Sequence, residues 1–342
     1  MIKAMFTSAI LALSANLAFA GGKLSLYHWF EYIPAELLEK FETETGVDVT
    51  MDTFDSNEAL LASLKAGKMG SYDLAVPGDY MVEIMAAEGM LDTINDGELK
   101  NKGNIEAQWL AAAFDPGRKH SIPYQWGSTS FSVNRDVYKG NINTTDIIFN
   151  PPDSLKGKIN VLDSQGEVMA LASLHLGIPQ CSNDRSQLKA LDSLLQSAKE
   201  NWASFGSDIA KDVLVSGDVA VGMIWNGFSS KAREEGANVE YAYPDQGYVV
   251  WMDNVVLLKD APNRDNALKF MDFLLEPENI AAVTNYAQYN AGVKGVKEFL
   301  DPVLASMPEN NPREGAGAGA FVAVCDQATQ EVYDQMWTRL RS

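Results

Sequence analysis

Residues 23–51, KLSLYHWFEYIPAELLEKFETETGVDVTM, decide the fold because they encode a strand, a helix and a second strand. Residues 23–28 alternate apolar and polar side chains, which is typical of a half-buried strand. Pro34 suits the first turn of the helix, and Gly46 suits its end. Residues 47–51 then supply the second strand, so the chain begins with a strand–helix–strand unit.

The same order of elements continues beyond this unit. Ser56 or Asn57 can cap a second helix, and residues 72–76 read as a third strand. Residues 77–80 then turn into a helix that ends near Gly89. Strands that alternate with helices predict an α/β fold, with a parallel sheet covered by helices on both faces.

The second half of the chain repeats this organisation without a sequence repeat. Further strands are expected at residues 158–162, 219–224 and 248–258, and helices at 184–200, 262–275, 277–286 and 326–341. Alternating Gly and Ala at residues 315–320 predict an exposed loop. Two α/β lobes place ligand sites at the carboxyl ends of strands, often in the cleft between the lobes.

The N-terminal residues 1–20 have the features of a secretory signal peptide. Lys3 gives a positive start, residues 4–17 are largely apolar, and residues 18–20 have the small-x-small form of a cleavage site. We therefore expect an exported protein whose mature chain begins at Gly21.

Composition limits the binding partners, the disulfide and the metal sites that can be expected. The chain has 27 Lys and Arg against 46 Asp and Glu, a net charge of −19. Such a charge argues against nucleic acid and anionic membranes, and is compatible either with solubility alone or with a cationic ligand. Cys181 and Cys325 are the only cysteines, and pairing is preferred in an oxidising compartment. No metal site is expected, because His28, His120 and His175 lack ligand spacing.

Two tryptophans each precede an acid by two residues. These stretches are Trp29-Phe30-Glu31 and Trp251-Met252-Asp253, and each adjoins or lies within a predicted strand. An indole face attracts a cation by about 0.5–2 kcal/mol, and a carboxylate adds a charge-assisted hydrogen bond. The pairs predict a site for an organic cation, provided that the fold brings them together. Trp109, Trp126 and Trp202 lack an acidic neighbour of this kind and are interpreted as packing residues.

Several motifs occur in a fixed order along the chain. They are residues 26–34 (LYHWFEYIP), 41–46 (FETETG), 72–77 (YDLAVP), 121–127 (SIPYQWG), 222–227 (GMIWNG) and 251–253 (WMD). Together they resemble the bacterial periplasmic spermidine/putrescine-binding proteins, over nearly the whole mature chain. The resemblance implies a two-lobed periplasmic binding protein fold, with lobe 1 at residues 21–125 and 253–297 and lobe 2 at residues 126–252 and 298–342.

The resemblance also implies a function. A periplasmic member of this family captures a polyamine and delivers it to an inner-membrane ABC permease, without a cofactor and without enzymatic activity. The ligand-binding residues carried over by position are Trp29, Glu31, Tyr32, Tyr80, Glu167, Trp225, Trp251, Asp253 and Tyr289, with Gln288 a rival for Tyr289. The aromatic rings would form walls around the ligand, and Glu167 and Asp253 would hold its ammonium groups. A monomer is expected.

Two positions depart from the family pattern. Ser164 stands where a second acid is usual, and Ala323 stands where the family has a glutamine. Asp163 or Asp79 could compensate for the missing acid. Otherwise the resemblance leaves open a diamine, or an amine that carries a neutral or acidic end.

Other functions stay open. A binder of another organic amine, or a sensor component that presents its ligand to a receptor, would use the same fold. A secreted glycan-active enzyme could use a carboxylate pair. The sequence has no G-x-S-x-G, H-E-x-x-H or G-x-x-x-x-G-K motif, which argues against the commonest enzyme classes.

Overall fold

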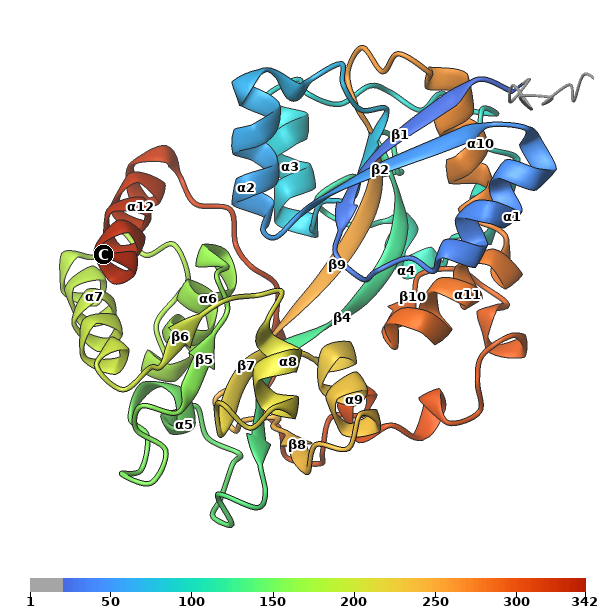
Figure 1. Ribbon diagram of the computed structural model, residues 1–342. Coiled ribbons are helices and arrows are strands. Elements are labelled where there is room, and N and C mark those ends of the chain that lie inside the picture. The colour runs from blue at the N-terminus through green and yellow to red at the C-terminus, as the bar shows by residue number, and fades with distance from the viewer. Residues whose placement is uncertain (1–20) are drawn as a thin grey trace, which may run out of the picture.

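The computed structural model describes residues 21–342, apart from the side chain of residue 305, so the predicted signal peptide lies outside the described residues. Two α/β lobes are connected by two long strands, β4 (Ser121–Asn134) and β9 (Tyr248–Leu257), which cross from one lobe to the other (Figure 1). These strands pair antiparallel along most of their length. The α/β fold with two lobes that the sequence predicted is therefore confirmed.

The first lobe contains the N-terminal elements and two later helices. Its main elements are β1 (Lys23–Trp29), α1 (Ala35–Thr45), β2 (Asp48–Phe54), α2 (Asn57–Ser63), a π-helical turn (Leu64–Lys68), β3 (Leu74–Ala75), α3 (Asp79–Ala87), a 3-10 helix (Lys100–Asn104), α4 (Ala107–Leu110), α10 (Arg264–Leu274), α11 (Pro277–Ala287) and β10 (Asn290–Ala291). The Ser56 hydroxyl accepts a hydrogen bond from the Ala59 amide at 3.1 Å, which confirms the predicted cap of α2.

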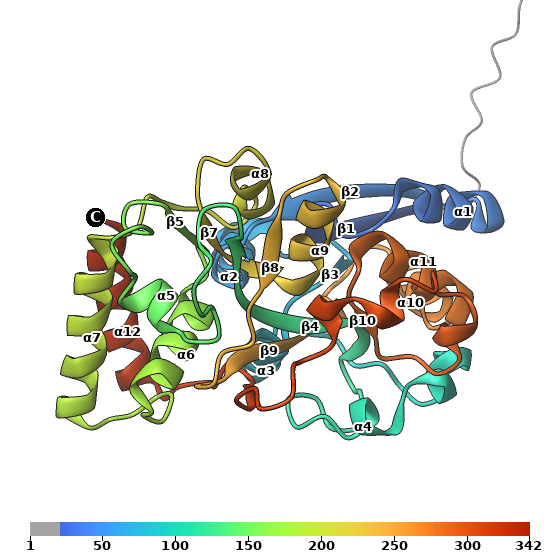
Figure 2. The same ribbon diagram turned by 90° about the horizontal axis from the view of Figure 1, so that it is seen from below.

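The second lobe is built from the middle of the chain and its C-terminal helix. Its elements are α5 (Asp146–Phe149), β5 (Ile159–Val161), α6 (Gln165–Leu176), α7 (Arg185–Lys199), β6 (Ser204–Phe205), α8 (Ala210–Val215), β7 (Val221–Trp225), α9 (Asn226–Glu234), β8 (Val239–Tyr241), β11 (Gly319–Ala320) and α12 (Gln327–Arg341). Three 3-10 turns, Val296–Glu298, Leu304–Ser306 and Pro308–Asn310, lie between β10 and β11. Figure 2 shows α7 and α12 side by side at the end of the molecule opposite α1.

The parallel arrangement predicted from the N-terminal strand–helix order is confirmed for β1, β2 and β3, whereas the sheet as a whole is mixed. The main strand order is β2-β1-β3-β9-β4-β7-β5-β6. The three strands at each end are parallel to one another, but β9 runs antiparallel to β3 and β4, and β4 runs antiparallel to β7. The crossing strand β4 has no counterpart among the predicted strands, because Pro123 and Gly127 interrupt its pattern.

The Gly/Ala segment at residues 315–320 is only partly the loop that its composition predicted. Its last two residues form β11, which pairs in parallel with Tyr248 and Val249. The missing side chain of Gly319 makes this pairing possible, because a Cβ there would lie 2.6 Å from the Val250 Cγ1 atom.

Each lobe has its own hydrophobic core. Phe131, Ile159 and Val221 are fully buried in the core of the second lobe, and Leu26 and Phe41 are buried in the first. Helices pack their apolar faces on these cores, which is why they form where the sequence is amphipathic. Among the helices of residues 21–342, none has the length and apolar character needed to cross a lipid bilayer.

A disulfide joins Cys181 to Cys325, with the two Cα atoms 5.0 Å apart. The predicted pairing is therefore confirmed. Cys181 follows α6 and Cys325 precedes α12, so the bond fastens the C-terminal segment to the second lobe. Gln180 adds to this attachment, because its side chain accepts from the Ala323 amide at 3.0 Å and donates to the Phe321 carbonyl at 2.9 Å.

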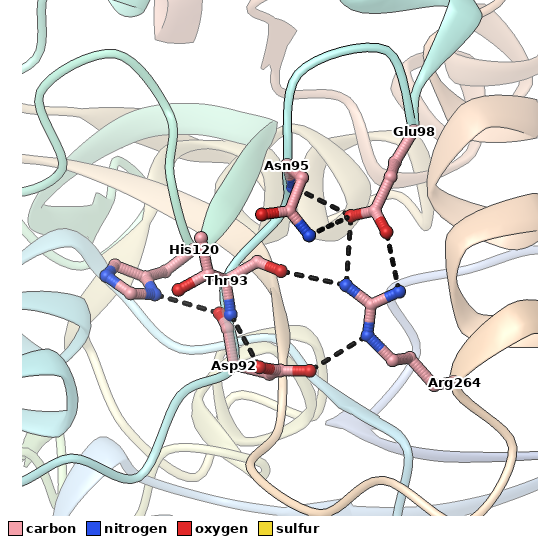
Figure 3. Close-up of polar contacts among 6 residues, drawn as sticks. All are labelled: Asp92, Thr93, Asn95, Glu98, His120 and Arg264. Atoms are coloured by element: carbon pink, nitrogen blue, oxygen red, sulfur yellow. Dashed lines mark hydrogen bonds and ion pairs between the residues drawn. The ribbon is translucent and has the colours of Figure 1, made fainter.

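An arginine clamp stabilises the first lobe (Figure 3). The Nε atom of Arg264 donates to Asp92 at 2.9 Å, and Nη1 and Nη2 donate to Glu98 at 2.8 and 2.9 Å. Nη2 also donates to the Thr93 carbonyl at 2.9 Å. The hydrogen bonds from Arg264 lower the pKa of Glu98 to about 2. None of these residues lines the cavity described below.

Candidate ligand-binding site

A cavity of about 640 Å³, including its mouth, lies between the two lobes. Eight of the nine predicted site residues line it: Trp29, Tyr32, Tyr80, Glu167, Trp225, Trp251, Asp253 and Tyr289. The other lining residues are Phe30, Asn57, Gly78, Asp79, Asp208, Phe228 and Val322. The site therefore gathers side chains from strand ends and helix starts that are far apart in the sequence.

Aromatic rings form much of the cavity wall. Trp29 ends β1 and Trp225 ends β7, and their ring centroids lie 6.1 Å apart across the two lobes. Trp251, on β9, packs edge-on against Tyr289 with centroids 4.9 Å apart. The Trp29 indole is fixed by a 2.7 Å hydrogen bond to the Val76 carbonyl. Rings packed edge-on in this way present both their faces and their edges to a bound ligand.

Gly127 allows Trp251 to lie close to the crossing strand β4. A Cβ at this position would stand 2.7 Å from the Trp251 Cζ2 atom. Any side chain here would therefore push the indole from its place. This is the physical reason for a glycine in the middle of a long strand.

Glu167 supplies a buried carboxylate from the first turn of α6. It accepts hydrogen bonds from the Thr129 hydroxyl and, at 3.0 Å, from the Trp225 indole. Burial raises its pKa, while the hydrogen bonds from Thr129, Ser164 and Trp225 oppose the rise. Position 164 thus places a neutral hydroxyl near Glu167 where the related proteins were expected to have a second acid.

Asp79 and Asp253 form the carboxylate wall of the first lobe. The side chain of Asp79 accepts from the Met252 and Tyr80 amides, each at 2.7 Å. Burial raises the pKa of Asp79 to about 7, against the effect of these amides. Burial also raises the pKa of Asp253 well above its usual value; the Tyr32 hydroxyl opposes this rise, and the carboxyls of Asp79 and Glu167 add to it. Ionised carboxylates in this place need a cation nearby.

The indole NH of Trp251 is a buried polar group of the wall that has no hydrogen-bond partner among residues 21–342. The Tyr32 hydroxyl, by contrast, interacts with the carboxyl of Asp253. The lining carries four carboxyl groups and, within the described chain, no lysine, arginine or histidine. Nowhere in residues 21–342 are three His, Cys, Asp or Glu side chains grouped to hold a metal ion. Acids spread among aromatic rings suit an organic cation better than a metal.

Comparison with known proteins identifies the family. The family model of bacterial extracellular solute-binding proteins matches residues 36–312. The chain belongs to this family. This solute-binding protein is 35% identical over 296 residues to the spermidine/putrescine-binding periplasmic protein of Escherichia coli, covering 86% of this chain and 85% of that one.

Two further relatives cover still more of the chain. A putrescine/cadaverine-binding protein of Pseudomonas aeruginosa is 30% identical over 352 residues, covering 100% of this chain and 96% of that one. The solved structure of the spermidine/putrescine ABC transporter substrate-binding protein PotD from Streptococcus pneumoniae superposes with a TM-score of 0.76 at 29% identity, covering 94% of this chain and 98% of that one. The resemblance expected from the motifs is thus confirmed.

One predicted residue of the solute-binding protein lies outside the cavity. Glu31 is exposed and does not line it; the pKa of Asp208 at the rim is raised by burial first, then by the charges of Asp55 and Glu31. Its backbone carbonyl accepts from the Lys231 Nζ atom at 3.5 Å. Gln288, the rival of Tyr289, instead donates to Glu234 at 2.6 Å and does not line the cavity.

Asp163 and Asp79, the two acids that could compensate for Ser164, also differ in whether they line the cavity. Asp163 forms an ion pair with Arg341 at 2.8 Å and is not part of the cavity wall. Asp79 lies in the cavity wall. From sequence, an acid in the first turn of a helix is normally interpreted as stabilising that helix. The feature that could have indicated a ligand contact is its position just after the third strand of the first lobe, at the carboxyl end of the sheet.

Proposed function

We propose that this protein is a periplasmic substrate-binding protein that captures a polyamine, spermidine or putrescine, and delivers it to an ABC importer. The single observation that carries the proposal is the cavity between the lobes, where tryptophan walls surround three buried carboxyls and no basic residue. Relatives named for spermidine and putrescine support the choice of ligand class.

The residue types fit an alkylammonium ligand. Flat rings cover methylene groups and attract the nitrogens, while each carboxylate neutralises one charge. We assign the aromatic contacts to Trp29, Trp225 and Trp251, and the charge contacts to Glu167 and Asp253. Asp79 joins this set because it is buried in the same wall.

The site also explains how loading is signalled. Glu167 belongs to the second lobe, whereas Asp253 and Asp79 lie on the first-lobe wall, with β4 and β9 crossing between the lobes. A cation that contacts both walls favours the closed arrangement, and unneutralised carboxylates oppose it. A membrane permease can then distinguish loaded from empty protein by shape. The lobe boundaries proposed from the sequence, near residues 125 and 252, fall within these crossing strands.

The other parts of the proposal follow from the family. The protein binds and releases its ligand unchanged, acts as a monomer in the periplasm, and needs no cofactor. Proteins of this kind are transport components, so catalysis is not required of the buried acids.

Isothermal titration calorimetry tests the proposal. Purified mature protein is titrated with putrescine, cadaverine, spermidine and spermine, with 1,4-butanediol as an uncharged control of similar length. We expect binding heat with at least one amine and none with the diol. Thermal unfolding of the same samples should show a higher unfolding temperature with that amine only, because a ligand that binds only the folded state stabilises it. Absence of binding to every amine would refute the proposed function.

A further inference from the structure

Two candidate site residues that lie outside the cavity, Glu31 and Gln288, both contact helix α9 of the second lobe. The backbone carbonyl of Glu31 accepts from the Lys231 Nζ atom at 3.5 Å, and the Gln288 side chain donates to Glu234 at 2.6 Å. Glu31 follows β1 and Gln288 follows α11, so both belong to the first lobe. Their neighbours in the chain line the cavity, and α9 therefore reaches the first lobe beside the ligand site.

These contacts share one face of α9 with a third contact at the start of the helix. Gly227, Lys231 and Glu234 follow one another at intervals of four and three residues, the spacing that places residues on one side of a helix. A Cβ at Gly227 would lie 2.5 Å from the Tyr289 Cε1 atom and 2.4 Å from the Ala287 carbonyl oxygen. A side chain at residue 227 would therefore hold α9 away from the first lobe.

Lys231 brings a positive charge to this contact. Its Nζ atom lies 4.3 Å from the centre of the Tyr286 ring, which belongs to α11 of the first lobe. The face of an aromatic ring attracts an ammonium group at this distance. Burial lowers the pKa of Lys231, and the charge of Glu31 opposes this change. The second lobe thus presents a cation to a ring and to a backbone carbonyl of the first lobe.

A cation is useful at this place because acids of both lobes lie near the mouth of the cleft. Burial raises the pKa of Asp208, on the second lobe, and the charges of Asp55 and Glu31, on the first lobe, raise it further. Repulsion of this kind opposes the approach of the lobes. Lys231 offsets it beside Glu31, and its Nζ atom can reach the Tyr286 ring only when the lobes are together.

We propose that the α9 face formed by Gly227, Lys231 and Glu234 is a clasp that holds the two lobes closed around the ligand, with Lys231 as its charged element. Lys231 does not line the cavity. It is a positioning residue, because it acts on the ligand only through the arrangement of the two walls. This inference rests on the proposed function and adds a residue that controls how long the ligand is retained.

The variant Lys231→Gln tests the clasp, because two explanations of the lysine predict opposite results. Removing a positive charge near a cation site would strengthen amine binding if the lysine acted by long-range electrostatics alone. Loss of the clasp should instead weaken the binding of putrescine or spermidine, whichever the unaltered protein binds, by about threefold or more in calorimetry. Stopped-flow measurements should assign this loss to faster dissociation, since a contact of the closed state slows release.

The matched control is Lys211→Gln. Lys211 pairs with Asp212 at 2.9 Å and with Glu235 at 2.7 Å, and both partners belong to the second lobe. This variant removes the same charge from the same lobe without touching the first lobe. It should therefore leave the dissociation rate unchanged.

Two further variants separate the ring contact from the charge. Lys231→Arg keeps the charge and can stack on Tyr286, so its affinity should stay within about twofold of the unaltered protein. Tyr286→Leu keeps the charge but removes the ring face, and it should reproduce the loss of Lys231→Gln. Tyr286 is 38% exposed, so this truncation spares the core, and circular dichroism checks the fold. The double variant should lose no more than either single variant, because both remove one interaction.

The clasp is refuted if Lys231→Gln binds the amine as tightly as the unaltered protein or more tightly, or if its weaker binding comes from slower association. Fully additive losses in the double variant would refute it as well. Failure of the unaltered protein to bind any amine would instead refute the proposed function, so the two failures are distinguishable.

Discussion

Two stretches of this chain share the same spacing of tryptophan and acid but differ in what the structure does with them. In residues 251–253, both Trp251 and Asp253 line the ligand cavity, and Asp253 is only 8% exposed. In residues 29–31, Trp29 lines the cavity but Glu31 is exposed to solvent. An identical local pattern therefore yields one complete aromatic–acid pair and one half pair.

The backbone explains the difference. Residues 251–253 lie inside β9, where side chains two positions apart point to the same face. Trp29 is the last residue of β1, and the chain then turns, with Glu31 at a φ of +48°. The turn sends the acid outward and brings the intervening Phe30 to the cavity rim. Two residues separated by one other residue therefore share a face only if both lie within the same strand.

The largest expected effect is at the complete pair. Asp253→Asn should weaken amine binding by about 2–5 kcal/mol, because an ammonium that loses its buried partner is left without a counter-charge. Calorimetry with the preferred amine measures the loss, and circular dichroism checks that the fold is retained. Near-normal affinity would remove Asp253 from the site.

The two tryptophans provide the next comparison. Trp251→Ala should cost about 2 kcal/mol of binding, since the ring lines the cavity and its NH makes no hydrogen bond within residues 21–342. Trp29→Ala should cost less binding and more stability, because Trp29 bonds to Val76 and packs 4.4 Å from Phe54 between ring centroids. Titration and thermal unfolding of both variants separate these contributions. Equal losses in both measurements would contradict the contrast.

The sequence predicts this site well where function depends on local position. Trp29 and Trp225 end strands that periodicity identifies, and sheet edges at strand ends are where ligands bind. Other lining residues give no local signal. Asp79 resembles an ordinary helix-start acid until the fold places the Met252 amide against it, and Val322 reaches the cleft only through the long return of the C-terminal segment. Such residues depend on tertiary contacts that a single sequence does not reveal.

A smaller effect is expected from pH, and it separates buried from exposed acids. The pKa of Asp79 in the unliganded fold is about 7, above its usual value. Binding a cation favours the ionised form, so affinity should rise about tenfold, or about 1.4 kcal/mol, between pH 6 and pH 8 while the amine stays protonated.

The stability of the unliganded protein should respond in the opposite direction. Because folding raises the pKa of Asp79, its contribution to stability is complete below about pH 4 and is lost as pH rises through 7. Asp79→Asn should weaken the pH dependence of both the amine affinity and the stability. The pH dependence that is left should come from Glu167 and Asp253. Titrations and thermal unfolding across this range provide the check, and an affinity independent of pH would show that Asp79 stays ionised.

The smallest effect is expected at the half pair, and it is the sharpest test of the comparison. Glu31→Gln should change amine affinity by less than about 0.5 kcal/mol, because an exposed carboxylate outside the cavity is screened by water and salt. Its influence on the rim acid Asp208 should appear instead as a slower association at low salt. Stopped-flow rates at two ionic strengths, measured beside calorimetry, distinguish these outcomes. A loss comparable to that of Asp253→Asn would mean that Glu31 turns inward when the ligand binds, and the two stretches would then be equivalent pairs after all.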